Sequence, residues 1–299
     1  MKNTPSIIQK LGFNADDKVV ILHIDDIGSS HSSNVASFEC LDYRIASCGS
    51  IIVPAPWFLE AVAFYKKFPK YDMGVHLTLT CEYNLYRWRA LSSVDPCTGL
   101  LDSEGCLWRT TEEAITNVTT IAAETELRKQ IQTALDNGID VTHIDTHMGT
   151  VMDPKFLPIY LKLAREFKIP AFLPKVTRPL LLERGFGKSA DFVLEMFQKL
   201  ETSGVPMLDH IIIDTGGGYE DKTAYYYKLI SEIEAGLTHL LFHAAKISPE
   251  LCAIDADSAE WRNQDYEAFI NPRLKECIKD NDIKIIGYRE IRDYLRTND

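Results

Sequence analysis

The segment VVILHIDDIGSS, residues 19–30, decides how we expect the chain to fold. Its first six residues are mostly apolar and β-branched, which predicts a buried strand over Val19–Ile24. Two carboxylates, Asp25 and Asp26, follow at once, and a helical pattern begins near Ser33. Adjacent carboxylates are costly to desolvate without partners, so one could bind a metal while the other faces a water. The alternative is a helix N-cap followed by a turn, because Asp caps helices well.

The alternation of short apolar runs with longer helical patterns continues along the chain, and one helix is expected over Glu112–Asp136. Seven or eight such repeats predict an α/β fold with a parallel sheet and outer helices. A (β/α) barrel, distorted or incomplete, is the expected form, and a doubly wound open sheet is the alternative. No linker or repeat divides residues 1–299, so we expect a single domain. The later strands are predicted at Ser50–Pro54, Met73–Leu79, Val141–Asp145, Ala171–Leu173, His210–Ile213, His239–Phe242 and Lys284–Ile286.

Composition and charge narrow the classes of function. The hydrophobic fraction is 45% and the net charge is −11, and both nucleic acid and anionic membranes favour a basic partner instead. The seven cysteines have no Cys-x-x-Cys spacing, the N-terminus has no long apolar segment of a signal peptide, and no run of 18 apolar residues occurs. These features predict a cytoplasmic protein with no nucleic-acid or membrane partner.

Polar side chains recur where the predicted strands end. In a (β/α) barrel the carboxyl ends of the strands meet at one mouth, which is where active sites lie. Imidazole and carboxylate together suit zinc or another divalent ion. We therefore expect one pocket to gather the polar residues of these ends, which are Asp25, Asp26, His76, His143, Asp145, His147 and His243.

The segment THIDTHMG, residues 142–149, is the strongest single signal for a metal site. If the strand continues through it, His143, Asp145 and His147 lie on one face, and the carboxylate can orient a ligating imidazole. The alternatives are a polar strand end here, a hydrogen-bonded core histidine at His76 and a structural role for His243.

Four short motifs follow one another along the chain: HIDDIG (23–28), GVHLTLT (74–80), THIDTHMG (142–149) and LLFHAA (240–245). In this order they resemble the Asp-Asp-Phe-Gly, Gly-x-His-Leu-Thr-Leu, Thr-His-x-Asp-Ser-His and late histidine motifs of the YdjC-like (ChbG/HpnK) carbohydrate deacetylases. The stretches WRNQDYEAF and IKIIGYREIRD resemble the family's closing segment. The resemblance extends from about residue 10 to residue 295.

The resemblance implies a (β/α)-barrel-like fold and hydrolysis of an N-acetyl group on an amino sugar or oligosaccharide, such as an acetylated chitooligosaccharide. It also implies one divalent metal ion, with Mg²⁺ or Zn²⁺ expected first. Carried over by position, the metal ligands are Asp26, His76 and His147, the general base is Asp25, the general acid is His243, and His143 and Asp145 are supporting residues.

The chain departs from the family pattern at several positions beside these motifs. Ile27 stands where the family often has Phe, and His23 where many members have Asn. Met148-Gly149 replaces a histidine-rich continuation, and Ala244 replaces a common Pro. None of these changes removes an implied ligand, but they indicate a subgroup and leave the sugar specificity open.

The residues fit amide hydrolysis without the family name. One Asp and two His leave coordination positions open, and a metal polarises a carbonyl and lowers the pKa of bound water. Asp25 would take the proton from that water, and protonated His243 would give one to the departing amine. Another metal-dependent amidase, a phosphoesterase and a non-catalytic sugar-binding protein are the alternatives, and a homodimer is compatible with the sequence.

The long loop over residues 80–110 is expected to be a lid or a wall of the site. Its aromatic residues would either stack on sugar rings or hold the loop down as a hydrophobic clasp. Arg87 and Arg262 would either contact substrate hydroxyls or form surface ion pairs. The aromatic residues in question are Tyr83, Tyr86, Trp88 and Trp108.

Overall fold

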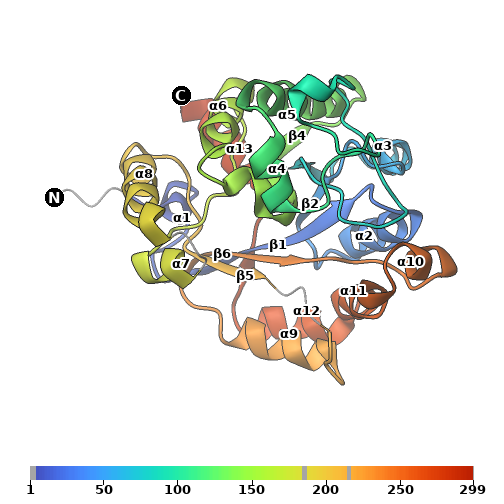
Figure 1. Cartoon of the computed structure of the whole chain (residues 1–299). Coiled ribbons are helices and arrows are strands. Elements are labelled where there is room, and N and C mark those ends of the chain that lie inside the picture. The colour runs from blue at the N-terminus through green and yellow to red at the C-terminus, as the bar shows by residue number, and fades with distance from the viewer. Residues whose placement is uncertain (1–4, 184–186, 214–216, 299) are drawn as a thin grey trace.

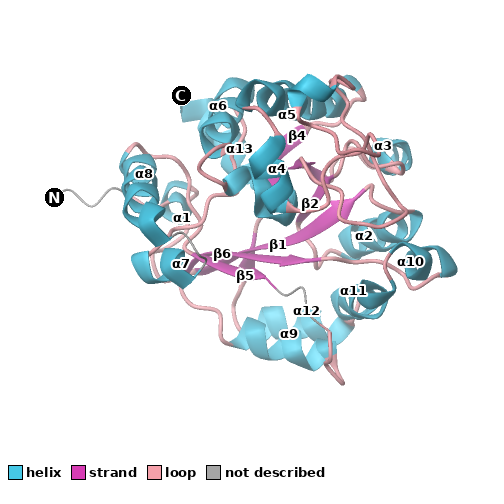
Figure 2. Cartoon of the chain, viewed as in Figure 1, coloured by secondary structure: helices cyan, strands magenta, loops and turns pink. Residues whose placement is uncertain are grey.

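A parallel sheet lies at the centre of the computed structural model, and helices surround it (Figure 1, Figure 2). The structure describes residues 5–183, 187–213 and 217–298. Within these ranges the strands are β1 (Lys18–Ile27), β2 (Cys48–Ile51), β3 (Asp72–Leu77), β4 (Val141–Thr146), β5 (His210–Ile213), β6 (Gly236–Phe242) and β7 (Lys284–Ile285).

The strands pair in the order β4-β3-β2-β1-β6-β5, and β7 pairs with the start of β1. Every pairing is parallel. The sheet does not close into a continuous ladder, so the prediction of an α/β, barrel-like but incomplete fold is confirmed. Parallel pairing places the carboxyl ends of all these strands at the same edge.

In the described part of the chain, isolated bridges lie between the edge strands β4 and β5: Ala171 pairs with Ile144 of β4, and Pro174 pairs with Leu208, which precedes β5. The strand predicted at Ala171–Leu173 is therefore wrong. The physical reason is its flanking residues, Pro170 and Pro174, which have no N–H to donate to a ladder.

The helix predicted over Glu112–Asp136 is also wrong as one element, because two helices occupy that stretch. Val118 has an extended conformation (φ −70°, ψ 126°), and the Thr119 hydroxyl accepts a hydrogen bond from the Ala122 N–H, which starts a new helix. The α-helices are α1 (Ile7–Lys10), α2 (His31–Tyr43), α3 (Phe58–Lys67), α4 (Thr111–Asn117), α5 (Thr120–Asp136), α6 (Leu157–Phe167), α7 (Arg178–Glu183), α8 (Ala190–Thr202), α9 (Lys222–Ser231), α10 (Pro249–Ile254), α11 (Ala256–Phe269), α12 (Pro272–Asp280) and α13 (Tyr288–Asn298). The 3₁₀ turns are η1 (Pro96–Thr98), η2 (His147–Met152) and η3 (Gly187–Ser189).

Alternation along β1 separates the apolar core from the polar site. Leu22 and Ile24 belong to the large apolar cluster that includes residues of the outer helices. Ile21 belongs to a smaller cluster on the other face of the strand. Because side chains alternate along a strand, His23 and Asp25 follow Ile21 on that second face.

Among the described helices, none has the length and apolar character needed to cross a membrane.

Candidate metal centre

Asp25 and Asp26 lie near the end of β1, where its pairing with β2 shifts register. Asp26 has a φ of 63°, in the left-handed region that few residues other than glycine adopt. Consecutive residues of a regular strand point to opposite faces. Here both carboxylates approach one ring, because His76 Nε2 lies 3.9 Å from Asp25 Oδ2 and 3.4 Å from Asp26 Oδ1.

Asp26, His76 and His147 bring one carboxylate oxygen and two imidazole nitrogens together. Asp26 Oδ1 lies 3.4 Å from His76 Nε2 and 3.2 Å from His147 Nδ1, and all three residues are buried. Asp26 Oδ1 accepts no hydrogen bond although it is buried. A buried carboxylate oxygen that accepts no hydrogen bond and faces two ring nitrogens fits a divalent cation bound by oxygen and nitrogen ligands.

Two further carboxylates contact the ring nitrogens of His76 and His147 that face away from Asp26 Oδ1. Asp145 Oδ1 lies 2.8 Å from His76 Nδ1, and Glu82 Oε2 lies 2.9 Å from His147 Nε2. Ser50 donates a hydrogen bond of 2.7 Å to the other oxygen of Asp145. Such partners fix the tautomer and the orientation of a ligating imidazole. Sequence reasoning missed Glu82, whose one signal was a carboxylate soon after the His76 motif.

Arg262 is a second residue whose place the sequence did not reveal. It reaches from α11 and donates a hydrogen bond of 2.8 Å to Asp26 Oδ2, and both residues are buried. The surface ion pair considered for Arg262 is therefore wrong. Burial alone would raise the pKa of Asp26, but Arg262 and the two histidines hold that pKa well below its usual range. Asp26 is consequently a carboxylate and not a carboxylic acid.

In the absence of a cation, the neighbouring carboxylates raise the pKa values of His76 and His147. Burial works against the charged form of His147, but Glu82 and Asp26 outweigh it and raise its pKa to about 9. Burial is likewise outweighed at His76, where Asp145 and Asp25 raise the pKa well above the usual value. A site that attracts protons in this way also attracts a divalent cation, which must displace those protons to bind.

His243 follows β6 and stands apart from the three converging residues. Its Nε2 lies 4.0 Å from Asp25 Oδ2, its Nδ1 is buried without a hydrogen-bond partner, and its backbone N–H donates to Asp265. Burial lowers the pKa of this imidazole, so its protonated form releases a proton readily.

The expectation that His143, Asp145 and His147 share one strand face is wrong. The strand β4 ends one residue before His147, which begins the turn η2. Met148 and Gly149 both have positive φ and reverse the chain there. His143 and Asp145 remain buried in β4, whereas His147 reaches Asp26 from the turn.

The helix cap considered for the two aspartates is wrong as well. Ser30 caps α2, and its hydroxyl accepts a hydrogen bond from the Ser33 N–H. His31 lies at the surface with a half-exposed side chain 2.8 Å from Glu60.

A cavity of ≈ 300 Å³ gives access to Asp25 and His243. Met148, Phe172 and Leu241 are among the residues that complete its wall. The cavity therefore offers a substrate both a polar side, where proton transfer could occur, and an apolar side.

The loop over residues 80–110 packs down through its aromatic residues. Tyr83 and Trp88 are 8% and 2% exposed and share an apolar cluster, and Trp88 donates a hydrogen bond from Nε1 to the Thr80 carbonyl. This burial agrees with the hydrophobic clasp for these two rings and leaves them no free face for a sugar. Arg87 is engaged within the same loop, with Nη2 2.8 Å from Asp102.

Comparisons with known proteins identify the relatives of the chain. The family model described as YdjC-like protein matches residues 19–280. A carbohydrate deacetylase from Thermus thermophilus is 27% identical over 97% of this chain and 99% of its own length. A carbohydrate deacetylase from Thermoanaerobacter pseudethanolicus is 21% identical over 91% of this chain and 98% of its own length.

One solved structure has a similar fold. It is described as a proposed cellobiose-phosphate cleavage protein from Enterococcus faecalis V583, with a TM-score of 0.76 at 21% identity. The match covers 92% of this chain and 99% of that one. Since the family model spans most of the sequence, the resemblance seen in the four motifs is confirmed, and the chain belongs to the YdjC-like family.

Proposed function

We propose that this YdjC-like protein is a carbohydrate deacetylase that uses one divalent metal ion to remove an acetyl group from an N-acetylated amino sugar or oligosaccharide. The observation that carries the proposal is the convergence of Asp26, His76 and His147 around a carboxylate oxygen that accepts no hydrogen bond. The deacetylases of Thermus thermophilus and Thermoanaerobacter pseudethanolicus, similar along nearly their whole length, support the reaction class.

The metal site is proposed to consist of Asp26 Oδ1, His76 Nε2 and His147 Nδ1. A divalent cation held there would polarise the amide carbonyl and lower the pKa of a water molecule. Arg262 occupies the second oxygen of Asp26, which leaves one oxygen for the cation. Mg²⁺ and Zn²⁺ are the proposed ions, because both accept oxygen ligands and zinc also favours imidazole.

Asp25 is the proposed general base. Its Oδ1 lies 2.7 Å from His23 Nδ1, which fixes the carboxylate, while Oδ2 faces His76 and His243 at about 4 Å. That oxygen is therefore placed to accept a proton from a water that attacks the acetyl carbonyl.

His243 is the proposed general acid. It lines the same cavity as Asp25. Burial lowers the pKa of its imidazole, so a smaller fraction is protonated at neutral pH, but the protonated form is a stronger acid towards the departing amine. In this proposal, Asp25 activates the water and His243 protonates the leaving amine, and both side chains line one cavity.

Acetate release from a panel of N-acetylated sugars that includes diacetylchitobiose tests the proposal. Activity should disappear after chelation and return with Zn²⁺ or Mg²⁺. The variant Asp25→Asn should keep bound metal and lose turnover, and Asp16→Asn, which removes an exposed carboxylate, is the matched control. No acetate from any sugar by metal-loaded protein, or hydrolysis of phosphate esters instead, contradicts the proposal.

A further inference from the structure

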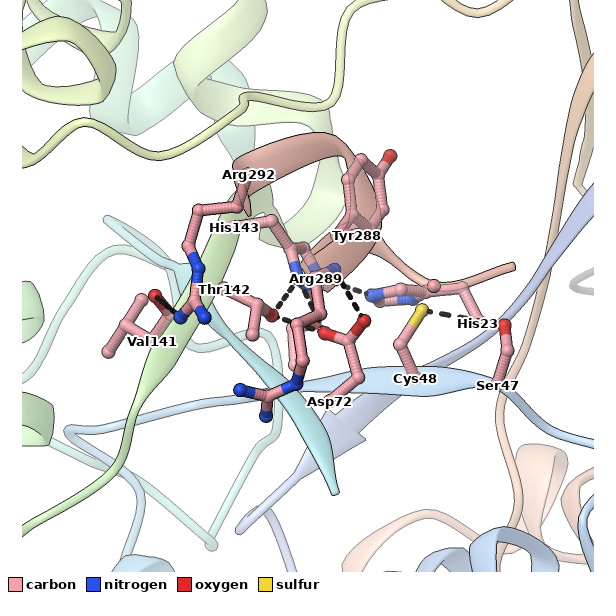
Figure 3. Close-up of polar contacts among 12 residues, drawn as sticks. His23, Ser47, Cys48, Asp72, Val141, Thr142, His143, Tyr288, Arg289 and Arg292 are labelled. Carbon is pink, nitrogen blue, oxygen red and sulfur yellow. Dashed lines mark hydrogen bonds and ion pairs between the residues drawn. The ribbon is translucent and has the colours of Figure 1, made fainter. Parts of the chain in front are cut away.

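Asp25 is the end of a buried row of polar contacts that crosses the strands. Within this row His23 Nε2 also lies 3.5 Å from Asp145 Oδ2, and the other oxygen of Asp145 contacts the proposed ligand His76. His23 Nδ1 lies 2.7 Å from Asp25 Oδ1, and His23 Nε2 lies 2.8 Å from His143 Nε2. His143 Nδ1 lies 2.9 Å from the Thr142 hydroxyl, which in turn contacts Asp72 Oδ1. Figure 3 shows the contacts that join His23, His143, Thr142 and Asp72. Asp72 begins β3, so the row runs from the amino end of one strand to the carboxyl end of another.

The far end of the row reaches the surface. Asp72 lines a cavity of ≈ 400 Å³ together with Arg44, Lys70 and Glu290. Its second oxygen accepts a hydrogen bond of 2.7 Å from the backbone N–H of Arg289. The three residues between the two carboxylates have no exposed surface.

Counting hydrogens shows what this row requires. It has four contacts, and each needs one hydrogen between its two heavy atoms. Neutral His23, neutral His143 and Thr142 supply three hydrogens, and two ionised carboxylates supply none. The row is complete only with one additional hydrogen, carried by Asp72, by an imidazole or by Asp25.

Asp72 can carry it at mildly acidic pH. Burial raises the pKa of Asp72 to about 6, so its neutral form persists to a higher pH than in an ordinary aspartate and predominates below that value. Burial also holds the pKa of His143 well below its usual range, although Asp145 acts in the opposite direction. With the hydrogen on Asp72, each group donates to the next: Asp72 to Thr142, Thr142 to His143 Nδ1, His143 Nε2–H to His23 Nε2, and His23 Nδ1–H to Asp25.

The neighbours of His143 hold its ring in place within this row. A Cβ atom at Gly74 would come within 2.5 Å of the His143 ring, so the glycine provides the space that the ring occupies. On its other side the ring stacks on Tyr288, with centroids 4.1 Å apart. Both neighbours restrict the ring to an orientation in which its two nitrogens meet Thr142 and His23.

We propose that Asp72, Thr142, His143 and His23 form a relay of positioning residues behind Asp25, in which one hydrogen carried on Asp72 sets both imidazole tautomers. The relay presents the His23 Nδ1–H to Asp25, and it orients that carboxylate with its other oxygen towards the cavity. A shift of the hydrogens along the row by one position leaves Asp72 ionised and His23 as an imidazolium, with the atoms and the net charge of the row unchanged. The proposal rests on the proposed role of Asp25 as general base.

Variants of Thr142 and Asp72 test the relay in metal-loaded protein. Thr142→Val removes the central hydroxyl at nearly constant size, and we expect kcat to fall by about tenfold with KM and metal content unchanged. Thr142→Ser restores the hydroxyl and should restore kcat. Asp72→Asn should stay active, because its amide N–H can donate to Thr142 permanently while its oxygen still accepts from Arg289.

The ¹⁵N resonances of the histidine rings give a readout that loss of stability would not imitate. Below about pH 6, where Asp72 is neutral, we expect His23 to carry its hydrogen on Nδ1 and His143 on Nε2 in the natural protein, and we expect the same tautomers in Asp72→Asn. Thr142→Val should lose the Nε2–H form of His143 as its single tautomer. The reverse tautomers in the natural protein, or an unchanged kcat in Thr142→Val, would overturn the proposal. Because the tautomers are read without substrate, they test the relay even if the protein releases no acetate.

Discussion

The hydrogen bond between Glu82 and His147 allows a quantitative test of the metal centre. Glu82→Gln replaces a carboxylate acceptor, 2.9 Å from His147 Nε2, with a neutral amide of the same shape. Burial raises the pKa of Glu82, but His147 outweighs it, so the side chain is ionised in the natural protein. The variant therefore removes the charge-assisted hydrogen bond at Nε2 of His147, the ring nitrogen that does not face the proposed metal.

The expected magnitude follows from the exposure of this contact. A hydrogen bond to a charged group contributes about 1.5–3 kcal/mol, and the Glu82 side chain is 28% exposed, which places the effect at the lower end. A loss of ~1.4 kcal/mol corresponds to an increase of about tenfold in the metal Kd. This agrees with the range of about 10–100-fold found when partners behind metal ligands are removed.

The assay is a competition titration of Zn²⁺ between the protein and a chelator of known affinity at constant pH. Glu112→Gln, which removes an exposed carboxylate, is the control for the change in net charge. Equal Kd values for Glu82→Gln and Glu112→Gln would refute the reasoning that Glu82 orients His147 for metal binding.

Three other measurements follow from the site and the core. Because the pKa of His147 is raised to about 9 in the metal-free protein and that of His76 is raised as well, metal must displace a proton from each protonated ring, so the Kd should rise by at least about tenfold for each unit that the pH falls below 9 and more steeply where His76 is also protonated; a Kd independent of pH contradicts this. Arg262→Met removes the guanidinium that pairs with Oδ2 of the buried Asp26 carboxylate and should lower the free energy of unfolding of metal-free protein by about 3 kcal/mol, measured with urea. An unchanged unfolding midpoint would disprove that role. Phe269→Ala removes a ring stacked on Phe242 with centroids 3.5 Å apart and should cost about 3 kcal/mol in the same assay, whereas a loss below about 1 kcal/mol would show that the core closes around the cavity.

The sequence predicted the fold class because hydrophobic periodicity is a local property. Alternation of strands and helices implied a parallel sheet, and a parallel sheet implied that Asp26, His76 and His147 would meet at one edge. Two elements were misjudged where a local feature interrupts the pattern. Proline on either side of residues 171–173 prevents a ladder, and the extended Val118 divides one helical pattern into two helices.

The parts of the site that were missed depend on contacts between distant segments. Arg262 lies on a helix 236 residues from Asp26, and no spacing rule connects them. Glu82 comes from a loop whose path is determined by packing of its aromatic residues. The left-handed conformation of Asp26 has a weak local signal, since Asp tolerates it, but only the structure shows that it turns two neighbouring carboxylates to one side.

The ion pair between Asp26 and Arg262 also has a consequence for the order of events on the ribosome. Synthesis proceeds from the amino end, so Asp26, His76 and His147 are all made before α11. If β1, β3 and β4 come together during translation, these three residues can meet while the guanidinium is still to be added. We expect the nascent chain to meet a divalent cation at a stage when no arginine yet shares the Asp26 carboxylate. The time at which a cell supplies the ion thus becomes a variable in the maturation of this protein, separate from the final affinity.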